Sequence, residues 1–400
     1  MAASNEARTD RLRIVHVFRA PLGGLFRHVL DLAGEQSARG HEVGMFYDGG
    51  AHCPRVEAAL ARIPGGLKLG VGTASIRRNP GISDVFALAR FVAFLRGAKP
   101  DVVHGHGSKG GAYARWSGWG RSGGPIRAYT PHGGSFNYRP GTAPHCVFML
   151  AERLMAPMTD VFLFESAYIA GRFDRFVGAK NGVRRVVANG IGAAEFTPVA
   201  PNEDAADLLY VGELRAAKGI DTLLDAIALV GRSRGVAPRA VLVGSGPDQA
   251  VLTERARRLG VAPFVTFPGP MPIGQALKLG RVLVVPSRAE SMPYVVLEAA
   301  AARVPMIATN VGGIPEIYGP FRDRLGPPDD PEDLRARIES ALDAPWDRRQ
   351  EEAADLAFYV AENFSIQTMV NSVMAGYREA MARRPRALVG APVATVQPHN

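Results

Sequence analysis

Two carboxylates separated by seven residues are the strongest candidates for chemistry in this 400-residue chain. Glu290 follows the apolar run 282–285, and Glu298 lies eight residues further on, in a segment that we expect to be helical. A helix N-terminus presents free backbone N–H groups and a partial positive charge, which suit a phosphate or a sugar hydroxyl. We interpret the pair as holding two ends of one ligand, the hydroxyls of a sugar and those of a ribose. The alternative is that Glu290 caps the helix and Glu298 is a solvated helix residue.

The segment between the two carboxylates offers backbone groups to the same ligand. Proline is tolerated in the first turn of a helix, so we place the start of the helix near Pro293. The residues expected to line the ligand here are Ser291, Met292, Pro293, Tyr294 and Val295.

Two cations form a second candidate group. Arg215 and Lys218 follow the apolar run 208–211, where a strand is expected to lead into a helix. Two positive charges at that place could stabilise a diphosphate leaving group. Gly244 and Ser245 end the next expected strand near the same edge and are further candidates. The alternatives are an ordinary charged surface for the cations and a plain turn for 244–247.

A glycine pair, Gly23 and Gly24, follows the first expected strand. Small residues allow a backbone to approach a phosphate closely, so we include both in the phosphate-binding group. The full G-x-G-x-x-G fingerprint is absent, which argues against a nicotinamide or flavin cofactor.

Histidines end two other expected strands. We expect His132, in the run 130–134, to form a hydrogen bond to a sugar hydroxyl near the reacting carbon. His106, in the run 104–108, is a further candidate. The spacing of His104 and His106 suggests a metal ligand pair, but no carboxylate or third histidine is adjacent in sequence. We therefore predict no metal site.

Short apolar runs alternate with longer amphipathic segments, which predicts two α/β domains with doubly wound parallel sheets. The alternation pauses in a polar, proline-rich segment at 196–204 and then restarts. The predicted organisation is a first Rossmann-like domain at 11–195, a linker at 196–204, a second domain at 205–365, a helix at 366–384 that crosses back to the first domain, and a disordered tail at 385–400. Ligands of such sheets bind at the carboxyl ends of the strands, here in the cleft between domains.

Composition and charge limit the classes of function. Two cysteines exclude a disulfide scaffold, and no stretch resembles a signal peptide or a membrane span, so we expect a cytoplasmic protein. Residues 1–198 carry 25 Lys and Arg against 14 Asp and Glu, whereas the rest carries 22 against 24. A basic first half favours an anionic partner. No module typical of nucleic-acid recognition is present, so we expect no nucleic-acid partner.

Taken in order, these motifs resemble the retaining glycosyltransferases of family 4, which have the GT-B fold. The resemblance extends from residue 13 to about residue 384. It rests on the ordered runs 23–25, 101–106, 130–133, 189–191, 211–219, 242–247, 290–298, 304–309 and 311–316. Where many members carry glycine in the loop, this chain carries Pro293, which removes one backbone N–H.

The resemblance implies roles for the matching residues. Arg215 and Lys218 correspond to the clamp on the donor diphosphate, with Gly23 and Gly24 as the phosphate-approach loop. Glu298 corresponds to the ribose ligand. Glu290 and the backbone of 291–295 correspond to the sugar end of the donor site, and His132 to the residue of the first domain that touches the donor sugar.

The implied reaction is transfer of a sugar from a nucleoside diphosphate, UDP first and GDP next, with retention of configuration. The implied acceptor is a glycan or polyprenyl-linked sugar in the synthesis of exopolysaccharide or another cell-surface glycan, and neither a cofactor nor a metal is expected. Two other readings share the fold: an isomerase similar to nucleotide-sugar 2-epimerases, and a non-catalytic subunit that partners an active enzyme.

The segment 136–158 mixes apolar residues with Arg139 and Arg153. With the basic first half, this predicts peripheral binding to an anionic membrane surface. The alternative is an ordinary helix whose apolar face lies in the core.

Overall fold

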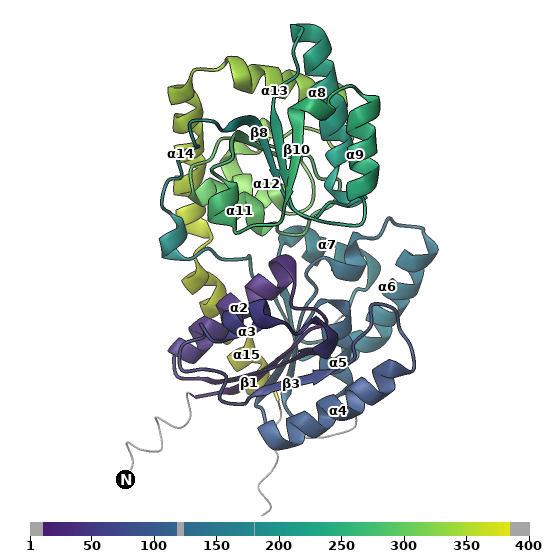
Figure 1. The fold of residues 1–400 in the computed structure, drawn as a ribbon. Helices are drawn as coiled ribbons and strands as arrows, with labels where there is room; N and C mark the ends of the chain where they lie inside the picture. Colours follow the sequence, from purple (N-terminus) through teal and green to yellow (C-terminus); the bar gives the residue numbers. More distant parts are fainter. Residues whose placement is uncertain (1–10, 118–123, 180, 385–400) are drawn as a thin grey trace, which may run out of the picture.

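The computed structural model of this chain describes residues 11–117, 124–179 and 181–384. The tail predicted to be disordered, 385–400, lies outside these residues. The described chain forms two α/β domains, one above the other in Figure 1, each with a parallel sheet between layers of helices. The predicted fold class is confirmed.

The first domain is built on seven parallel strands in the order β3-β2-β1-β4-β5-β6-β7. The central strands are buried except for Arg13, because both faces of the sheet are covered by helices, which explains their continuous apolar runs. The strands are β1 (Arg13–Val17), β2 (Glu42–Asp48), β3 (Val71–Ala74), β4 (Val102–His106), β5 (Ile126–Thr130), β6 (Val161–Phe164) and β7 (Val183–Val186). The helices are α2 (Gly23–Ala38), α3 (Pro54–Leu60), α4 (Ser83–Ala98), α5 (Gly107–Trp116), α6 (Ala143–Met155) and α7 (Ala167–Phe176).

The second domain has five parallel strands in the order β10-β9-β8-β11-β12. They are β8 (Ala206–Val211), β9 (Ala240–Val243), β10 (Val265–Gly269), β11 (Gly280–Val285) and β12 (Met306–Ala308). The helices are α8 (Ile220–Arg234), α9 (Gln249–Arg258), α10 (Ile273–Ala276), α11 (Tyr294–Ala301), α12 (Ile314–Tyr318), α13 (Pro331–Asp343) and α14 (Trp346–Asn363). Both sheets reverse direction of winding beside their first strand, so the loops after β1 and β4 and after β8 and β11 meet at the carboxyl edges.

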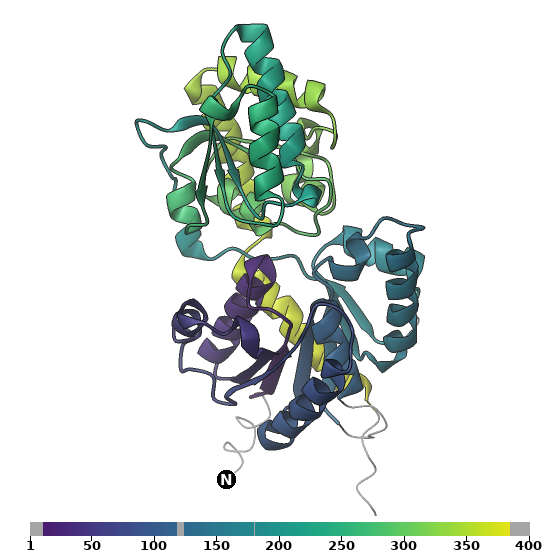
Figure 2. The ribbon, with the colours of Figure 1, turned by 45° about the vertical axis from the view of Figure 1, so that its right-hand side comes forward.

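The last helix, α15 (Ile366–Arg383), packs on the first domain although it follows the second. It lies against α2 and strands β5 to β7, and the turned view shows it running beneath the first sheet (Figure 2). The two segments that join the domains also pair with each other. The N–H of Ile191 donates to the carbonyl of Phe364 at 2.7 Å, and the N–H of Ile366 donates to the carbonyl of Ile191 at 3.1 Å. The chain therefore crosses between domains twice at one place.

Candidate active site

Glu290 lies in the loop between β11 and α11 and is buried. Its Oε1 accepts hydrogen bonds from Nζ of Lys218 at 2.6 Å and from Oγ of Ser287 at 2.7 Å. Pro293 is the N-cap of α11, and no side chain caps that helix. The alternative role of Glu290 as a helix cap is therefore wrong: the carboxylate faces the cation of the neighbouring loop.

Glu298 lies in α11 with 13% of its side chain exposed, so it is not a solvated helix residue. It forms an ion pair with Arg27 of α2, in the other domain. The same guanidinium donates two hydrogen bonds of 2.6 Å to Glu195 and lies 4.6 Å from the centre of the Tyr294 ring. Burial lowers the pKa of Arg27, but the carboxylates around it outweigh burial and raise it. The residue expected to bind ribose is thus held by a cation that the sequence analysis did not identify.

Lys218 and Arg215 lie on the short 3-10 turn between β8 and α8, beside the Glu290 loop. Lys218 is mostly covered by its pairing with Glu290. Arg215 is 43% exposed, and its one ion pair within the described residues is with Glu213, at 3.0 Å. The neighbouring turn that carries Gly244 and Ser245 packs directly on this one, since the N–H of Leu214 donates to the carbonyl of Ser245 at 3.0 Å. The second domain therefore gathers its predicted cations and carboxylate at one edge of the sheet.

The glycine loop of the first domain faces α11. Gly23 begins α2, and a Cβ on Gly24 would lie only 3.3 Å from Cδ2 of Tyr294. The hydroxyl of Tyr294 is 3.4 Å from Nδ1 of His28. The structure thus brings the glycine pair of the first domain next to Tyr294 and Glu298 of the second domain.

His132 follows β5 with a φ of 53°, an uncommon conformation for a residue with a side chain. The next residue, Gly133, donates its N–H to the buried carboxyl of Glu165, and the Ser291 side chain also bonds to that carboxyl. Burial raises the pKa of Glu165 to about 7. A Cβ on Gly133 would lie 3.1 Å from Cβ of Ser291. The loop that carries His132 therefore touches the Glu290 loop through Glu165 and Ser291.

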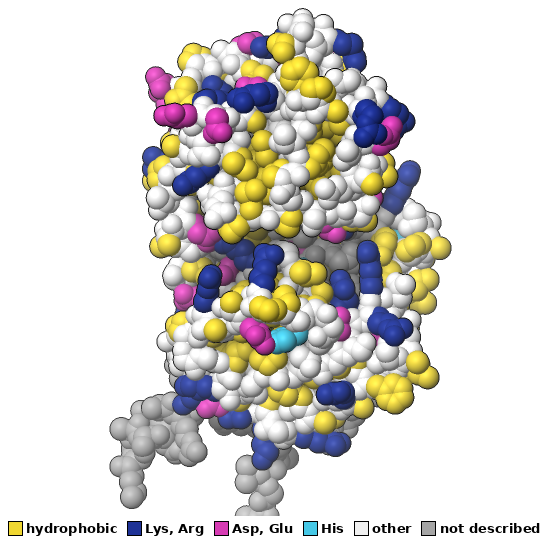
Figure 3. All heavy atoms as spheres, viewed as in Figure 1, with side chains coloured by type: hydrophobic (Ala, Val, Ile, Leu, Met, Phe, Trp, Pro, Cys, Tyr) yellow, Lys and Arg dark blue, Asp and Glu magenta, His cyan; other side chains and the backbone are white. Residues whose placement is uncertain are grey.

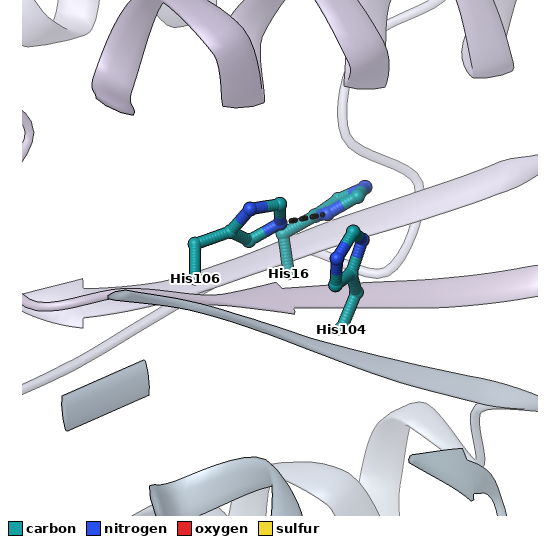
Figure 4. A group of neighbouring side chains, drawn as sticks. All are labelled: His16, His104 and His106. Atoms are coloured by element: carbon teal, nitrogen blue, oxygen red, sulfur yellow. Dashed lines mark hydrogen bonds between the residues drawn. The ribbon is translucent and has the colours of Figure 1, made fainter. Parts of the chain in front are cut away.

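His106 belongs to a cluster of five histidines, four from β1, β4 and the loop after β5 and one, His28, from α2. Two sets of three have ring nitrogens within 4.8 Å of one another: His16, His104 and His106, and His28, His106 and His132. Figure 4 shows the first set, in which His106 Nε2 lies 3.0 Å from His16 Nδ1. The sequence shows no third histidine next to His104 and His106, but the fold brings His16 and His28 close to them. The lack of a third histidine is therefore no reason to exclude a metal. The prediction itself stays a prediction.

Besides Arg27, two residues that the sequence did not mark as functional also join the two domains, Asn189 and Glu316. Asn189 donates from Nδ2 to the carbonyl of Met292 at 2.7 Å and accepts on Oδ1 from His28 at 3.0 Å. Glu316 accepts from the N–H groups of Ala167 and Tyr168 at 2.8 and 2.9 Å, so a carboxylate of the second domain caps α7 of the first. Asn189 and Glu316 lie in the runs 189–191 and 311–316, which contribute to the family resemblance, so the sequence could have identified them. Arg27 lies in none of the runs that carry the resemblance.

A hollow separates the two domains on the face drawn in Figure 3, and Lys and Arg side chains follow its first-domain rim. The predicted site residues of both domains come from the loops that border this boundary. The arrangement is two parallel-sheet domains whose carboxyl edges face each other, with cations, carboxylates and histidines between them. Such a fold and site define a protein of the GT-B class.

Comparison with known proteins agrees with this class. Residues 22–195 match the family model described as Glycosyltransferase Family 4, and residues 193–357 match the model described as Glycosyl transferases group 1. The chain is thus similar to Glycosyltransferase Family 4 in its first domain and to Glycosyl transferases group 1 in its second.

Curated relatives support the same conclusion. The D-inositol 3-phosphate glycosyltransferase of Rhodococcus erythropolis is 27% identical over 94% of this chain and 92% of the relative. That of Segniliparus rotundus is 30% identical over 58% of this chain and 55% of the relative, and the glycogen synthase of Mycobacterium tuberculosis is 36% identical over 40% of each. The chain therefore spans about half or less of the length of the latter two relatives.

Solved structures show the same fold. Sucrose-phosphate synthase from Thermosynechococcus elongatus superimposes with a TM-score of 0.73 at 22% identity, covering 93% of this chain and 100% of that one. Anabaena HepE in complex with UDP-glucose superimposes with a TM-score of 0.73 at 17% identity, with the same coverage.

Proposed function

We propose that this protein transfers a sugar from a nucleoside diphosphate, UDP first and GDP next, to a glycan or polyprenyl-linked acceptor, with retention of anomeric configuration and without a metal. The observation that carries the proposal is the grouping of Lys218, Arg215 and Glu290 at one edge of the second sheet, where the Glu290 loop touches the His132 loop next to Ser291. The complexes of Anabaena HepE with UDP and UDP-glucose support a uridine donor in this fold.

In the proposed reaction the acceptor hydroxyl attacks the anomeric carbon on the face from which the diphosphate leaves. The bond from that carbon to the phosphate oxygen breaks, the bond to the acceptor oxygen forms, and a donor phosphate oxygen takes the acceptor proton. Lys218 and Arg215 offset the charge that develops on the leaving diphosphate. Glu290 and Glu298 accept hydrogen bonds from sugar and ribose hydroxyls, respectively. The protein mainly positions the reactants and stabilises charge.

Both carboxylates have cation partners before the donor arrives, at 2.6 Å for Lys218 and Glu290 and through Arg27 for Glu298. Donor binding therefore requires an exchange of partners: Lys218 turns from Glu290 to the diphosphate, and Glu298 turns from Arg27 to the ribose. In the ligand-free protein, the charged groups proposed to bind the donor neutralise each other as the pairs Lys218–Glu290 and Arg27–Glu298.

Thermal unfolding with UDP, GDP, ADP, dTDP and CMP, each alone, tests the donor site. A nucleotide at about 100 times its Kd adds roughly 2.7 kcal/mol to the folded state. We expect a rise in Tm with UDP that Arg215→Met and Glu298→Gln reduce and that the exposed control Arg257→Met leaves unchanged. A UDP shift that both site variants retain, or no shift with any nucleotide, would overturn the proposed site.

Turnover separates transfer from the other readings. With UDP-sugars and candidate acceptors, a transferase releases UDP and glycosylates the acceptor, whereas an epimerase changes the sugar of the donor without net release of UDP and a non-catalytic subunit does neither. Proton NMR of the newly formed product then reports the anomeric configuration, and an inverted product would contradict retention.

We propose further that helix α6 places the acceptor side at an anionic membrane surface. Met149 faces the core, but Val147, Leu150 and Leu154 are more than half exposed on one face of this helix, and exposed Arg153 lies beside them. No helix in the described part of the chain is long and apolar enough to cross a membrane. An apolar stripe next to arginines suits the headgroup region of a bilayer.

Liposome flotation tests this surface. We expect the protein to float with vesicles of phosphatidylcholine and phosphatidylglycerol at low salt, and Leu150→Glu with Leu154→Glu to abolish flotation. The matched control is Val251→Glu, an exposed apolar residue of the second domain. Flotation that the double variant retains, or none with wild type, would contradict the proposal.

A further inference from the structure

The amide of Gln36, on α2, is oriented by Met374, because a thioether sulfur can only accept a hydrogen bond. Its Nε2 donates toward Sδ of Met374 at 3.7 Å and bonds to the Tyr377 hydroxyl, both on α15. Its Oε1 therefore faces Nε2 of His16, at 2.8 Å. An amide oxygen only accepts, so Nε2 of His16 carries the proton and Nδ1 does not.

The direction of the bond from His16 to Gln36 determines the directions of the two histidine–histidine bonds that follow it. Nδ1 of His16 accepts from Nε2 of His106 at 3.0 Å, which leaves Nδ1 of His106 without a proton. That nitrogen in turn accepts from Nε2 of His132, also at 3.0 Å. The argument requires each ring to be neutral, and burial lowers the pKa of His16 to about 4 and the pKa values of His106 and His132 well below their usual range.

The chain of bonds ends at the site. Gln36, His16 and His106 are buried, whereas His132 is partly exposed. Nδ1 of His132 has no hydrogen-bond partner among the residues that the structure describes. His104 takes no part in the chain, because its nitrogens bond to the Tyr377 hydroxyl at 2.7 Å and to Oγ1 of Thr130 at 2.9 Å.

We propose that Gln36 is a positioning residue: through His16 and His106 it holds His132 in the tautomer with the proton on Nε2. Nδ1 of His132 is thereby kept as an acceptor for a hydroxyl of the donor sugar. This rests on the proposed function of His132. The C-terminal helix takes part as well, since Met374 and Tyr377 fix the amide that starts the chain.

Replacement of the amide reverses the chain. In Gln36→Leu the proton on Nε2 of His16 would have no acceptor, and an unpaired buried N–H is costly. His16 then carries its proton on Nδ1 and donates to His106, which donates from Nδ1 to Nε2 of His132. The proton of His132 moves to Nδ1, and the site presents a donor where it had an acceptor.

Nitrogen-15 NMR of the histidine rings in the ligand-free full-length protein tests the tautomers directly, with His132 assigned through His132→Ala. We expect an unprotonated Nδ1 at His132 in wild type and a protonated one in Gln36→Leu. The matched control is Met369→Leu, a buried residue of α15 that takes no part in this chain of hydrogen bonds. A wild-type His132 with its proton on Nδ1 overturns the proposal, as does a tautomer that Gln36→Leu leaves unchanged.

Kinetics test the consequence for the donor. We expect Gln36→Leu to raise the KM for the donor sugar about tenfold, the effect of one lost hydrogen bond, with a smaller change in kcat. Met369→Leu should behave as wild type. If His132→Ala turns over normally while the tautomers follow the expectation, the chain stands and the role of His132 fails. If His132 does not show the expected tautomers in wild type and in Gln36→Leu, the inference fails whatever the activity of the variants.

Discussion

At the scale of single residues, burial decides which side chains of the site carry charge. Burial lowers the pKa values of His16, in β1, and His28, in α2, so both act as neutral hydrogen-bond partners. Glu165 is affected in the opposite direction, because burial disfavours its carboxylate and raises its pKa to about 7. Its Oε2 has no hydrogen-bond partner among the described residues, which agrees with a carboxyl group that keeps its proton.

Stability should therefore depend on pH through Glu165. Its pKa is raised from 4.5 to about 7 in the folded protein, so its contribution is complete below pH 4.5 and is lost as pH rises through 7. The loss amounts to about 3 kcal/mol, at 1.36 kcal/mol per pKa unit. Glu165→Gln stays neutral and retains an oxygen for the N–H of Gly133. We expect the free energy of unfolding of this variant to gain on wild type between pH 5 and 8, as measured by urea denaturation.

The comparison needs a control for other titrating groups. Glu362→Gln, in which the replaced side chain is exposed, should run parallel to wild type over the same pH range. If Glu165→Gln also ran parallel, the carboxyl of Glu165 would be ionised throughout and the argument from burial would be wrong.

At the scale of elements, the sequence predicted the strands and helices better than the contacts between them. Apolar runs such as 282–285 are long enough to identify buried strands, and they identify the edge at which Glu290 and Lys218 meet. Arg27 gave no such signal, because it is one charge in an amphipathic helix and its partners lie 168 and 271 residues away. His16 was also missed, because it reads as one more residue of the apolar strand 13–18. Contacts that depend on the packing of two domains are not encoded in local periodicity.

The position of the Glu290 loop also depends on the loop between β12 and α12, which packs against it through Gly312. Gly312 has a φ of +59°, and a Cβ at this position would lie 1.9 Å from the carbonyl oxygen of Glu290. We expect Gly312→Ala to cost about 1–3 kcal/mol of stability and to displace the loop. The Tm shift with UDP should shrink in this variant, as measured by thermal unfolding with and without nucleotide.

A second glycine serves as the comparison. Gly274, at the start of α10, has open space where its Cβ would be. Gly274→Ala should keep both its Tm and its UDP shift. Equal behaviour of the two variants would mean that the Glu290 loop tolerates displacement and that its position does not determine nucleotide binding.

At the scale of the whole molecule, the two domains are joined in two different ways. The paired segments at 191 and 364–366 are backbone contacts and lie where the chain itself crosses. The remaining contacts are between side chains or from side chain to backbone, and they lie at the site: Arg27 with Glu298, Asn189 with Met292, and Glu316 with the start of α7. Backbone pairing of this kind can serve as a hinge, whereas the contacts at the site can be exchanged for a ligand.

Removal of Arg27 tests whether the side-chain contacts at the site, rather than the backbone pairing, hold the two domains closed. Arg27→Met leaves Glu298 and Glu195 without their common cation, and two carboxylates that face each other repel. We expect the ligand-free variant to be more open than wild type, with a larger radius of gyration in small-angle X-ray scattering, while the hinge contacts keep the domains joined. Arg234→Met is the control, since its ion pair with Asp343 lies within the second domain. Identical scattering of wild type and Arg27→Met would show that Asn189, Glu316 and the hinge hold the closed arrangement without Arg27, and that the donor need not displace this cation to separate the domains.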